Sequence, residues 1–252
     1  MSLDHVPHTE EERQHHHGKE PRELRMQAMR SLIARSEQET RRAKQLRYRV
    51  FVHEKGWEAP QSDDVDEESD IYDDHAEHGL LFDAVAGRDI GAVRIILTSP
   101  DRPGLPMQRI CSAPQFDDAE MMRRSCEVSR LCILKDYRSA GGLVSINTEC
   151  GLLLRLVSTI AEIALENGRT RLFALMEPRL IQKLALCGID FEPIGEAVEH
   201  RGMRHPTMLK DIGETLEHMR NHHRAAWEIV SDAGRLELMA RRLKLSPRAE
   251  SA

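Results

Sequence analysis

The chain has 252 residues, enough for one domain of ordinary size with extensions. Its formal net charge of −6 argues against a nucleic-acid-binding protein, because such proteins are usually basic. Five cysteines without regular spacing do not predict a disulfide framework. The sequence contains no run of 18 apolar residues, so no transmembrane helix is predicted. The composition therefore predicts a protein of the reducing cytoplasm.

The N-terminal residues 1–20 are polar and rich in histidine, which predicts a disordered leader. His15, His16 and His17 are metal-ligand types, but no second ligand cluster accompanies them, so we expect no metal site. Pro21 is suited to the first position of a helix, and loosely spaced apolar residues favour a helix from there to about Arg49. We expect the main domain to span residues 21–210.

Three strands are predicted in the middle of the chain. Residues 79–86 and 90–98 are apolar runs separated by a Gly-Arg-Asp turn, which is typical of a hairpin. Arg94 interrupts the second run, between apolar neighbours, and is a candidate for a buried polar site. Residues 61–74 are densely acidic, and residues 99–120 contain four prolines, so both are expected to be loops.

The third strand, residues 126–134, has an unusual content for a buried strand. It carries Glu127, Ser129 and Arg130, and burying an unpaired charge costs several kcal/mol or shifts its pKa. In a regular strand Glu127 and Arg130 would face opposite sides, so they can face one cavity only if a bulge lies between them. We therefore expect a bulged strand that forms the floor of a pocket.

The remaining elements alternate between helix and strand. Helices are predicted at about 147–167 and 178–186, and strands at 171–176 and 191–198. Residues 211–252 are expected to be a charged helical extension with a weak apolar stripe. We expect a solvated helix, with packing on the domain or self-association as the alternatives. This order predicts an α+β fold, an α/β three-layer sandwich with a mixed sheet. A Gly-x-Gly-x-x-Gly fingerprint, a P-loop and a Gly-x-Ser-x-Gly elbow are all missing from the sequence.

Four motifs in order resemble the acyl-homoserine lactone synthases (autoinducer synthases of quorum sensing) and their relatives, the N-acyl amino acid synthases and exosortase-associated acyltransferases. The motifs are Arg47-x3-Phe51-x5-Trp57, Asp70-Ile71-Tyr72-Asp73, Gly91-Ala92-Val93-Arg94 and Glu127-Val128-Ser129-Arg130. The segments around Met176-Glu177-Pro178 and His200-Arg201-Gly202 look closer to the exosortase-associated branch. The resemblance implies the GNAT acyltransferase fold, with a splayed central sheet flanked by helices.

The resemblance also implies a site and a reaction. Asp70, Asp73, Arg94, Glu127 and Arg130 would form one buried charged cluster, with Arg47, Phe51 and Trp57 binding substrate. The reaction implied is transfer of a fatty acyl group from an acyl-carrier-protein thioester to the α-amine of an amino acid, with no tightly bound cofactor. The alternatives are a lactone synthase that uses S-adenosylmethionine, a coenzyme A-dependent acetyltransferase, and a non-catalytic carrier-protein-binding module.

Glu127 is the candidate general base, and Arg94 and Arg130 would tune its pKa. The bulge would free a backbone N–H near Leu131 or Cys132 as an oxyanion donor, while Ser129 donates to the oxyanion or orients Glu127. A cysteine nucleophile is disfavoured because no histidine neighbours Cys126 or Cys132 in the sequence.

Two features concern the acyl donor. Residues 138–142 match the coenzyme A pyrophosphate loop only partly, which favours a carrier protein as donor. Carrier proteins are acidic, so a basic docking patch is expected. Two sets of residues are candidates for this patch: Arg41, Arg42, Lys44 and Arg49, or Arg155, Arg169, Arg171, Arg179 and Lys183.

Overall fold

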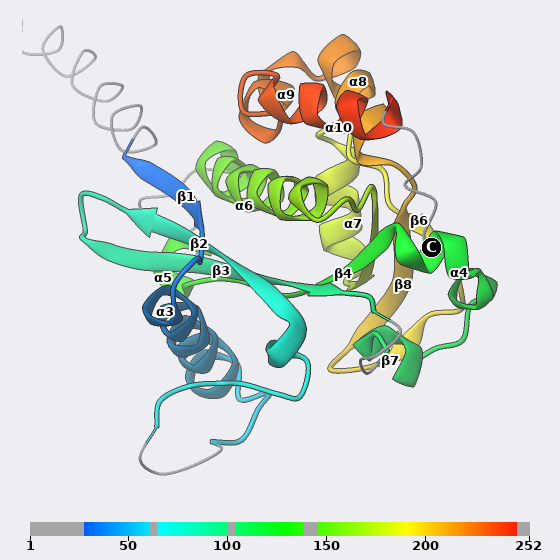
Figure 1. Ribbon diagram of the computed structural model, residues 1–252. Coiled ribbons are helices and arrows are strands. Elements are labelled where there is room, and N and C mark those ends of the chain that lie inside the picture. Colours follow the sequence, from blue (N-terminus) through cyan, green and yellow to red (C-terminus); the bar gives the residue numbers. More distant parts are fainter. Residues whose placement is uncertain (1–27, 61–64, 100–103, 139–145, 246–252) are drawn as a thin grey trace, which may run out of the picture.

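The computed structural model describes residues 28–60, 65–99, 104–138 and 146–245. A mixed sheet forms the centre, with strand order β1-β2-β3-β4-β5-β8-β6 and β7 paired with β8 (Figure 1). The strands are β1 Met29–Ile33, β2 Ala76–Asp83, β3 Arg88–Leu97, β4 Ser125–Ile133, β5 Arg171–Met176, β6 Glu192–Pro193, β7 Val198–Glu199 and β8 Met203–Leu209. Among the described strands, β4 and β5 are the one parallel pair, and the other pairs are antiparallel. The predicted mixed α+β sheet is confirmed.

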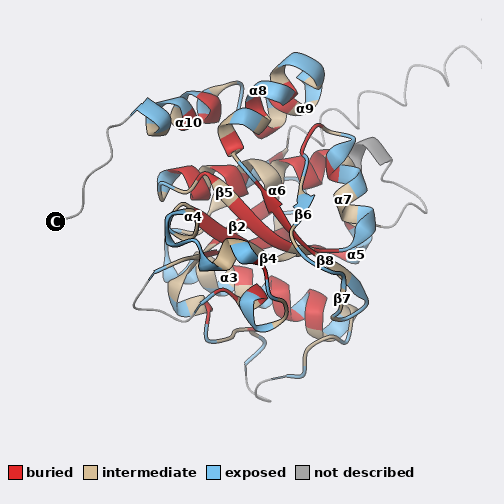
Figure 2. Cartoon of the chain, turned by 90° about the vertical axis from the view of Figure 1, so that its right-hand side faces the viewer, coloured by how far each residue is buried: buried red, intermediate tan, exposed pale blue. Residues whose placement is uncertain are grey.

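Helices cover both faces of this sheet. The helix α3 (Glu37–Tyr48) lies on one face against β2 and β3, and α6 (Ile146–Glu166) lies on the other face (Figure 1). Shorter elements surround them: α4 Ala119–Arg123, α5 Lys135–Arg138, α7 Pro178–Ala185, and 3₁₀ turns at Asp73–His75, Pro106–Arg109 and Pro114–Asp117. Figure 2 shows that buried residues concentrate in the sheet and on the inward sides of the helices.

The helix α3 begins at a capping motif formed by neighbouring residues, and it continues into a π-helical turn instead of ending at a cap. The Ser36 hydroxyl accepts from the Glu39 backbone N–H, and the Glu39 carboxylate accepts from the Ser36 N–H, forming a capping box. The chain then passes directly into a π-helical turn, Arg49–Glu54, in which the Lys55 N–H donates to the Val50 carbonyl. Gly56, at φ +62°, ends this segment.

Three sequence predictions are wrong. Residues 29–33 form β1 rather than part of a long helix, because they pair with β2, a tertiary contact that local spacing does not reveal. The long strand after α7 is β8, Met203–Leu209, not 191–198; Pro206 within it lacks an N–H and disguises the strand. The predicted loop 99–120 contains two 3₁₀ turns and the start of α4 in the part that the structure describes.

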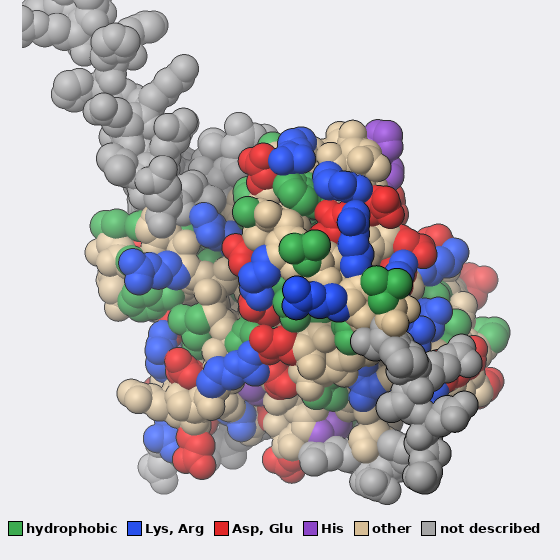
Figure 3. Space-filling view, turned by 45° about the horizontal axis from the view of Figure 1, so that its top comes forward, with side chains coloured by type: hydrophobic (Ala, Val, Ile, Leu, Met, Phe, Trp, Pro, Cys, Tyr) green, Lys and Arg blue, Asp and Glu red, His purple; other side chains and the backbone are tan. Residues whose placement is uncertain are grey.

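The C-terminal region also differs from the expected solvated helix. It forms α8 Ile212–His222, α9 Arg224–Val230 and α10 Arg235–Leu245, which pack outside α6 (Figure 1). The predicted stripe is buried, with Leu216 at 1% and Met219 at 0% exposed. The buried Glu237 accepts a hydrogen bond from the Trp227 indole N–H at 3.1 Å. The outward surface of these helices mixes basic and acidic side chains (Figure 3). The predicted leader, residues 1–20, lies outside the described residues.

Candidate active site

The strand β4 is bulged where its charged residues lie. Ala92 of β3 is opposite Cys132, but Arg94 is opposite Ser129, so β4 contains one residue more than β3 between these pairs. Arg130, within the extra length, has φ +52°, which is uncommon for a residue with a side chain. A bulge was expected between Glu127 and Arg130; the structure has it at Arg130–Leu131, so that Arg130 lies within it.

The two central parallel strands also separate at this level. Pairing of β4 with β5 ends at Val128 and Ala174, although both strands continue. A cavity of about 200 Å³, which we call the central cavity, opens between them. Most of its lining is apolar: Phe51, Trp57, Ile110, Val128, Leu131, Leu153, Val157, Ile160, Leu172, Ala174, Leu175, Met176, Leu180, Leu184, Ile189, Phe191 and Leu209. Its polar lining is Glu127, Ser129, Arg130, His200, Arg201 and Arg204.

Glu127 is the carboxyl group of this cavity and is only 3% exposed. Its Oε2 accepts a hydrogen bond from the Met107 backbone N–H at 3.0 Å, in the first turn of a 3₁₀ helix. Burial raises the pKa of Glu127 to about 7, against the smaller opposing effects of that hydrogen bond, Arg94 and Arg130. A carboxyl group with this pKa can exchange a proton near neutral pH.

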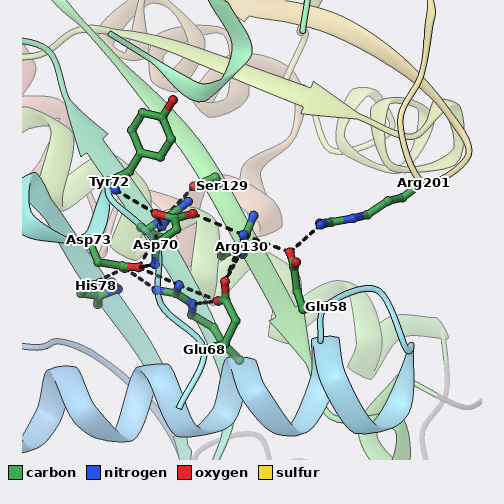
Figure 4. Close-up of polar contacts among 11 residues, drawn as sticks. Glu58, Glu68, Asp70, Tyr72, Asp73, His78, Ser129, Arg130 and Arg201 are labelled. Atoms are coloured by element: carbon green, nitrogen blue, oxygen red, sulfur yellow. Dashed lines mark hydrogen bonds and ion pairs between the residues drawn. The ribbon is translucent and has the colours of Figure 1, made fainter. Parts of the chain in front are cut away.

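Arg94 and Arg130, which act on the pKa of Glu127, belong to a network of ion pairs that does not include Glu127. Figure 4 shows this network. Its members are four arginines and four carboxylates: Arg47, Arg94, Arg130, Arg201, Glu58, Glu68, Asp70 and Asp73. The predicted cluster is thus corrected: the structure joins Asp70, Asp73, Arg94 and Arg130, but Glu127 has no ion pair among the described residues. Equal numbers of positive and negative groups let the network be buried without net charge.

The inner half of the network is centred on Asp73. Arg47, fully buried, donates to Glu68 at 2.6 Å and to Asp73 at 2.6 Å. Arg94 donates to Asp70 at 2.5 Å and to Asp73 at 3.1 Å. Burial alone would raise the pKa of Asp73, but Arg47 and Arg94 hold it well below its usual range. Asp73 therefore stays ionised at neutral pH.

The outer half of the network reaches the central cavity. Arg130 donates through Nε to Glu68 at 3.0 Å and through Nη2 to Glu58 at 3.1 Å. Glu58 also forms an ion pair with Arg201 at 2.6 Å, and Arg201 belongs to the β7–β8 turn (Figure 4). The sequence did not single out Glu58, Glu68 and Arg201 as site residues. Glu68 lies in the acidic run, where one carboxylate cannot be distinguished from the others.

The other predicted residues separate into cavity-lining and network positions. Phe51 and Trp57 line the central cavity and stack with ring centroids 6.0 Å apart. Ser129 also lines it and accepts a hydrogen bond from Arg94 Nε at 3.0 Å. Leu131 lines it as well, whereas Arg47 does not and lies within the network. Phe51 follows Arg47 by four residues, a spacing that would place both on one face of an α-helix, but Phe51 lies in the π-helical turn, where this spacing does not hold.

Cys132 faces a second cavity of about 360 Å³, adjacent to the first. We call it the basic cavity because its lining includes Lys55, Arg138, Arg179, Lys183 and Arg204 with a single carboxylate, Glu177. Trp57, Leu131, Leu153, Leu180 and Arg204 line both cavities. Burial raises the pKa of the Cys132 thiol to about 12, so Cys132 is unsuited as a nucleophile.

Two features missing from the described residues bear on other classes of function. No cluster of three or more histidine, cysteine or acidic side chains there has a geometry that could hold a metal ion. None of the described helices is both long and apolar enough to cross a membrane. The histidines 15–17 and most of the predicted pyrophosphate loop, residues 139–142, lie outside the described residues.

Comparison with known proteins agrees with this geometry. Residues 46–147 match the acetyltransferase (GNAT) domain family. None of the curated proteins is detectably similar in sequence. Among solved structures, TofI in complex with an inhibitor and MTA is similar with a TM-score of 0.58 and 21% identity, covering 76% of this chain and 96% of that chain.

Two further structures extend the comparison. MesI, a CoA-dependent acyl-homoserine lactone synthase, is similar with a TM-score of 0.55 and 18% identity, over 77% of this chain and 95% of that chain. FeeM, an N-acyl amino acid synthase from uncultured soil microbes, is similar with a TM-score of 0.51 and 16% identity, over 75% of this chain and 94% of that chain. At these identities the likeness establishes the fold. Residues 46–147 thus match the acetyltransferase (GNAT) domain family, and the chain has the fold of these acyl-homoserine lactone synthases and of an N-acyl amino acid synthase.

Proposed function

We propose that the protein is an N-acyltransferase that moves a fatty acyl group from an acyl-carrier-protein thioester to the amine of an amino acid or a derivative of one. The observation that carries this proposal is Glu127: a buried carboxyl group with a pKa of about 7, in a mostly apolar cavity between separated strands. Apolar walls suit a fatty acyl chain, and the carboxyl group suits proton removal from an amine.

In the proposed reaction the amine nitrogen attacks the thioester carbonyl carbon. Glu127, directly or through a water molecule, accepts the proton that the ammonium group must lose. The carbon–sulfur bond then breaks, and the thiolate leaves and takes up a proton. The strand at Arg130–Leu131 is unpaired with β3, whereas Cys132 pairs with Ala92. Of the two expected oxyanion donors, the backbone N–H of Leu131 is therefore the proposed one, with Ser129 beside it.

The basic cavity is the proposed entry for the donor. Arg179 and Lys183 are exposed on α7 at its edge, where an acidic carrier protein can dock and a phosphopantetheine can reach the central cavity. The other candidate residues are less suited: Arg42 is engaged with Asp89 at 2.6 Å, and Arg169 donates to the Thr98 carbonyl at 2.8 Å.

Charge reversal tests this entry. Arg179→Glu is expected to weaken carrier-protein binding several-fold at low salt and less at high salt, because salt screens exposed charges. Arg41→Glu is the matched control, since Arg41 is also an exposed arginine and belongs to the other candidate patch. Binding is measured by titration at two ionic strengths. Equal weakening by both variants, or no salt dependence, would contradict this docking surface.

The reaction itself is tested with acyl-carrier protein and a panel of standard amino acids. We expect thiol release that depends on an amine, and a linear N-acyl amino acid by mass spectrometry. An acyl lactone formed only with S-adenosylmethionine would instead identify a lactone synthase, and release with acyl-coenzyme A alone would identify a different donor. No thiol release with any amine and either donor would contradict acyl transfer.

A further inference from the structure

The wall of the central cavity nearest the β7–β8 turn is positively charged. Arg130, Arg201 and Arg204 line the cavity, whereas the acids that pair with them, among them Glu58 and Glu177, do not. Besides Glu127, no described lining residue is acidic. The pKa of His200, which also lines this wall, is lowered. The main cause is burial, and the positive charges of Arg201, Arg204 and Arg130 lower it further.

The turn that carries Arg201 is held in one conformation by several contacts. The His200 N–H donates to the Gly202 carbonyl at 3.0 Å, and Arg201 has φ +55°. Arg204 donates to the carbonyls of His200 and Arg201, both at 3.3 Å. An L-residue in the left-handed region costs about 1 kcal/mol or more and persists where the surrounding contacts fix it, often at ligand sites.

Arg201 is also tied to Arg130 through a shared carboxylate. Its Nη2 pairs with Glu58, the same carboxylate that accepts from Arg130 (Figure 4). One acid thus holds two guanidinium groups together. Among the described residues, Nε and Nη1 of Arg201 and Nη1 of Arg130 have no hydrogen-bond or ion-pair partner. Two adjacent guanidinium groups with free N–H donors match the geometry of a carboxylate or phosphate group.

Positively charged side chains also lie over the aromatic rings that line the cavity. Lys55 Nζ lies 3.9 Å from the centroid of the Trp57 ring, and Arg204 lies 5.3 Å from it. Arg130 lies 5.7 Å from the centroid of the Phe51 ring. The protein's own cations therefore occupy the positions over these rings where a ligand cation would bind.

We propose that the β7–β8 turn selects the acceptor by charge: Arg201, together with Arg130, binds an anionic oxygen group carried by the acceptor amine. Carboxylate and phosphate share this chemistry. This inference rests on the proposed acyl transfer and adds to it a residue that holds the acceptor while Glu127 removes its proton. Arg201 lies about 150 residues after Arg47, outside the four sequence motifs.

The test compares acceptors that differ only in this group. Standard amino acids, their α-carboxamides and the corresponding α-aminophosphonates are offered with the same acyl-carrier protein. We expect the wild-type protein to use the anionic acceptors with a KM about tenfold to a hundredfold below that of the amides, the range expected for hydrogen bonds to a charged group. The amino acid and aminophosphonate arms then distinguish carboxylate from phosphate as the natural group.

Substitution at the turn assigns this preference to Arg201. Arg201→Gln should raise KM for the anionic acceptor toward the amide value and leave KM for the amide unchanged, with kcat changed little. Arg201→Lys keeps the positive charge but loses the paired N–H donors of the guanidinium group, so its KM for the anionic acceptor should lie between those of the wild type and Arg201→Gln. It replaces Arg201→Gln as the test if that variant does not fold. Arg42→Gln is the matched control, an arginine paired with one carboxylate and 34% exposed, compared with 29% for Arg201.

Two outcomes would overturn the inference. Equal use of amides and anionic acceptors by the wild-type protein would show that no charged group is recognised. Equal effects of Arg201→Gln on both acceptors would show that Arg201 is only structural. Either result leaves acyl transfer itself intact, whereas the absence of thiol release with every amine would reject the proposed function first.

Discussion

Strand β4 carries both Glu127 and Arg130, a member of the ion-pair network, but Glu127 and the network are buried in different ways. In the network each carboxylate faces at least one guanidinium group, and the pKa values of Asp70 and Asp73 are lowered. Glu127 has one backbone N–H as its described hydrogen-bond partner, and its pKa is raised to about 7. A buried acid with charged partners is a structural support, whereas one without them is poised to exchange a proton.

The largest expected effect concerns the isolated carboxyl group. Glu127→Gln keeps the shape and can still accept the hydrogen bond from Met107, but it cannot take a proton. We expect turnover to fall about 10²- to 10⁴-fold, the usual contribution of a general base, with an unchanged fold by circular dichroism. Turnover at the wild-type rate would show that Glu127 is not the base.

The next effect concerns the network. Arg47→Met removes a fully buried guanidinium group that donates to Glu68 and Asp73. We expect the free energy of unfolding to fall by about 3–5 kcal/mol, because two buried acids each lose a partner. Denaturant unfolding measures this loss, and Arg47→Lys, which keeps the charge, should lose less. A loss below about 1 kcal/mol for Arg47→Met would mean that the network does not stabilise the fold.

The smallest expected effect is on the pH dependence of stability, which differs between Glu127 and the ion-pair network. Since the pKa of Glu127 is about 7 in the folded protein and 4.5 is its usual value, the folded state keeps the proton between these values while the unfolded chain releases it. Stability due to this group is therefore complete below pH 4.5 and is lost as pH rises to 7. Glu127→Gln should match the wild type near pH 4.5 and exceed it by up to about 3 kcal/mol at pH 8.

Thermal unfolding across this pH range measures that difference. The paired acids change stability in the opposite direction, since their lowered pKa values favour the folded state as pH rises through the acid range. A difference between Glu127→Gln and the wild type that does not grow above pH 5 would contradict the raised pKa.

The sequence predicted much of the scaffold and part of this contrast. Two charges in an apolar strand were enough to infer the bulge in β4, because regular alternation would have placed them on opposite faces. The hairpin, β5 and α6 followed from periodicity and turn residues. Strand β1 and the packing of α8–α10 did not, because both depend on tertiary partners rather than on local pattern.

The distribution of the charges was harder to predict than their burial. Glu127 was assigned to the arginine cluster, yet its position in β4 places it against Met107. Glu58, Glu68 and Arg201 come from a loop, an acidic run and a distant turn, so no spacing rule joins them to Arg130. Only the folded structure shows that Glu127, unlike the acids of the network, has no arginine as an ion-pair partner.

The most direct test is a ¹³C NMR titration of the glutamate carboxyl groups, with the Glu127 signal assigned by its absence in Glu127→Gln. The account predicts a midpoint near pH 7 for Glu127, well above the usual 4.5. A midpoint at or below 4.5 would show that Glu127 is a paired, ionised carboxylate like those of the network, and would contradict its role as the base.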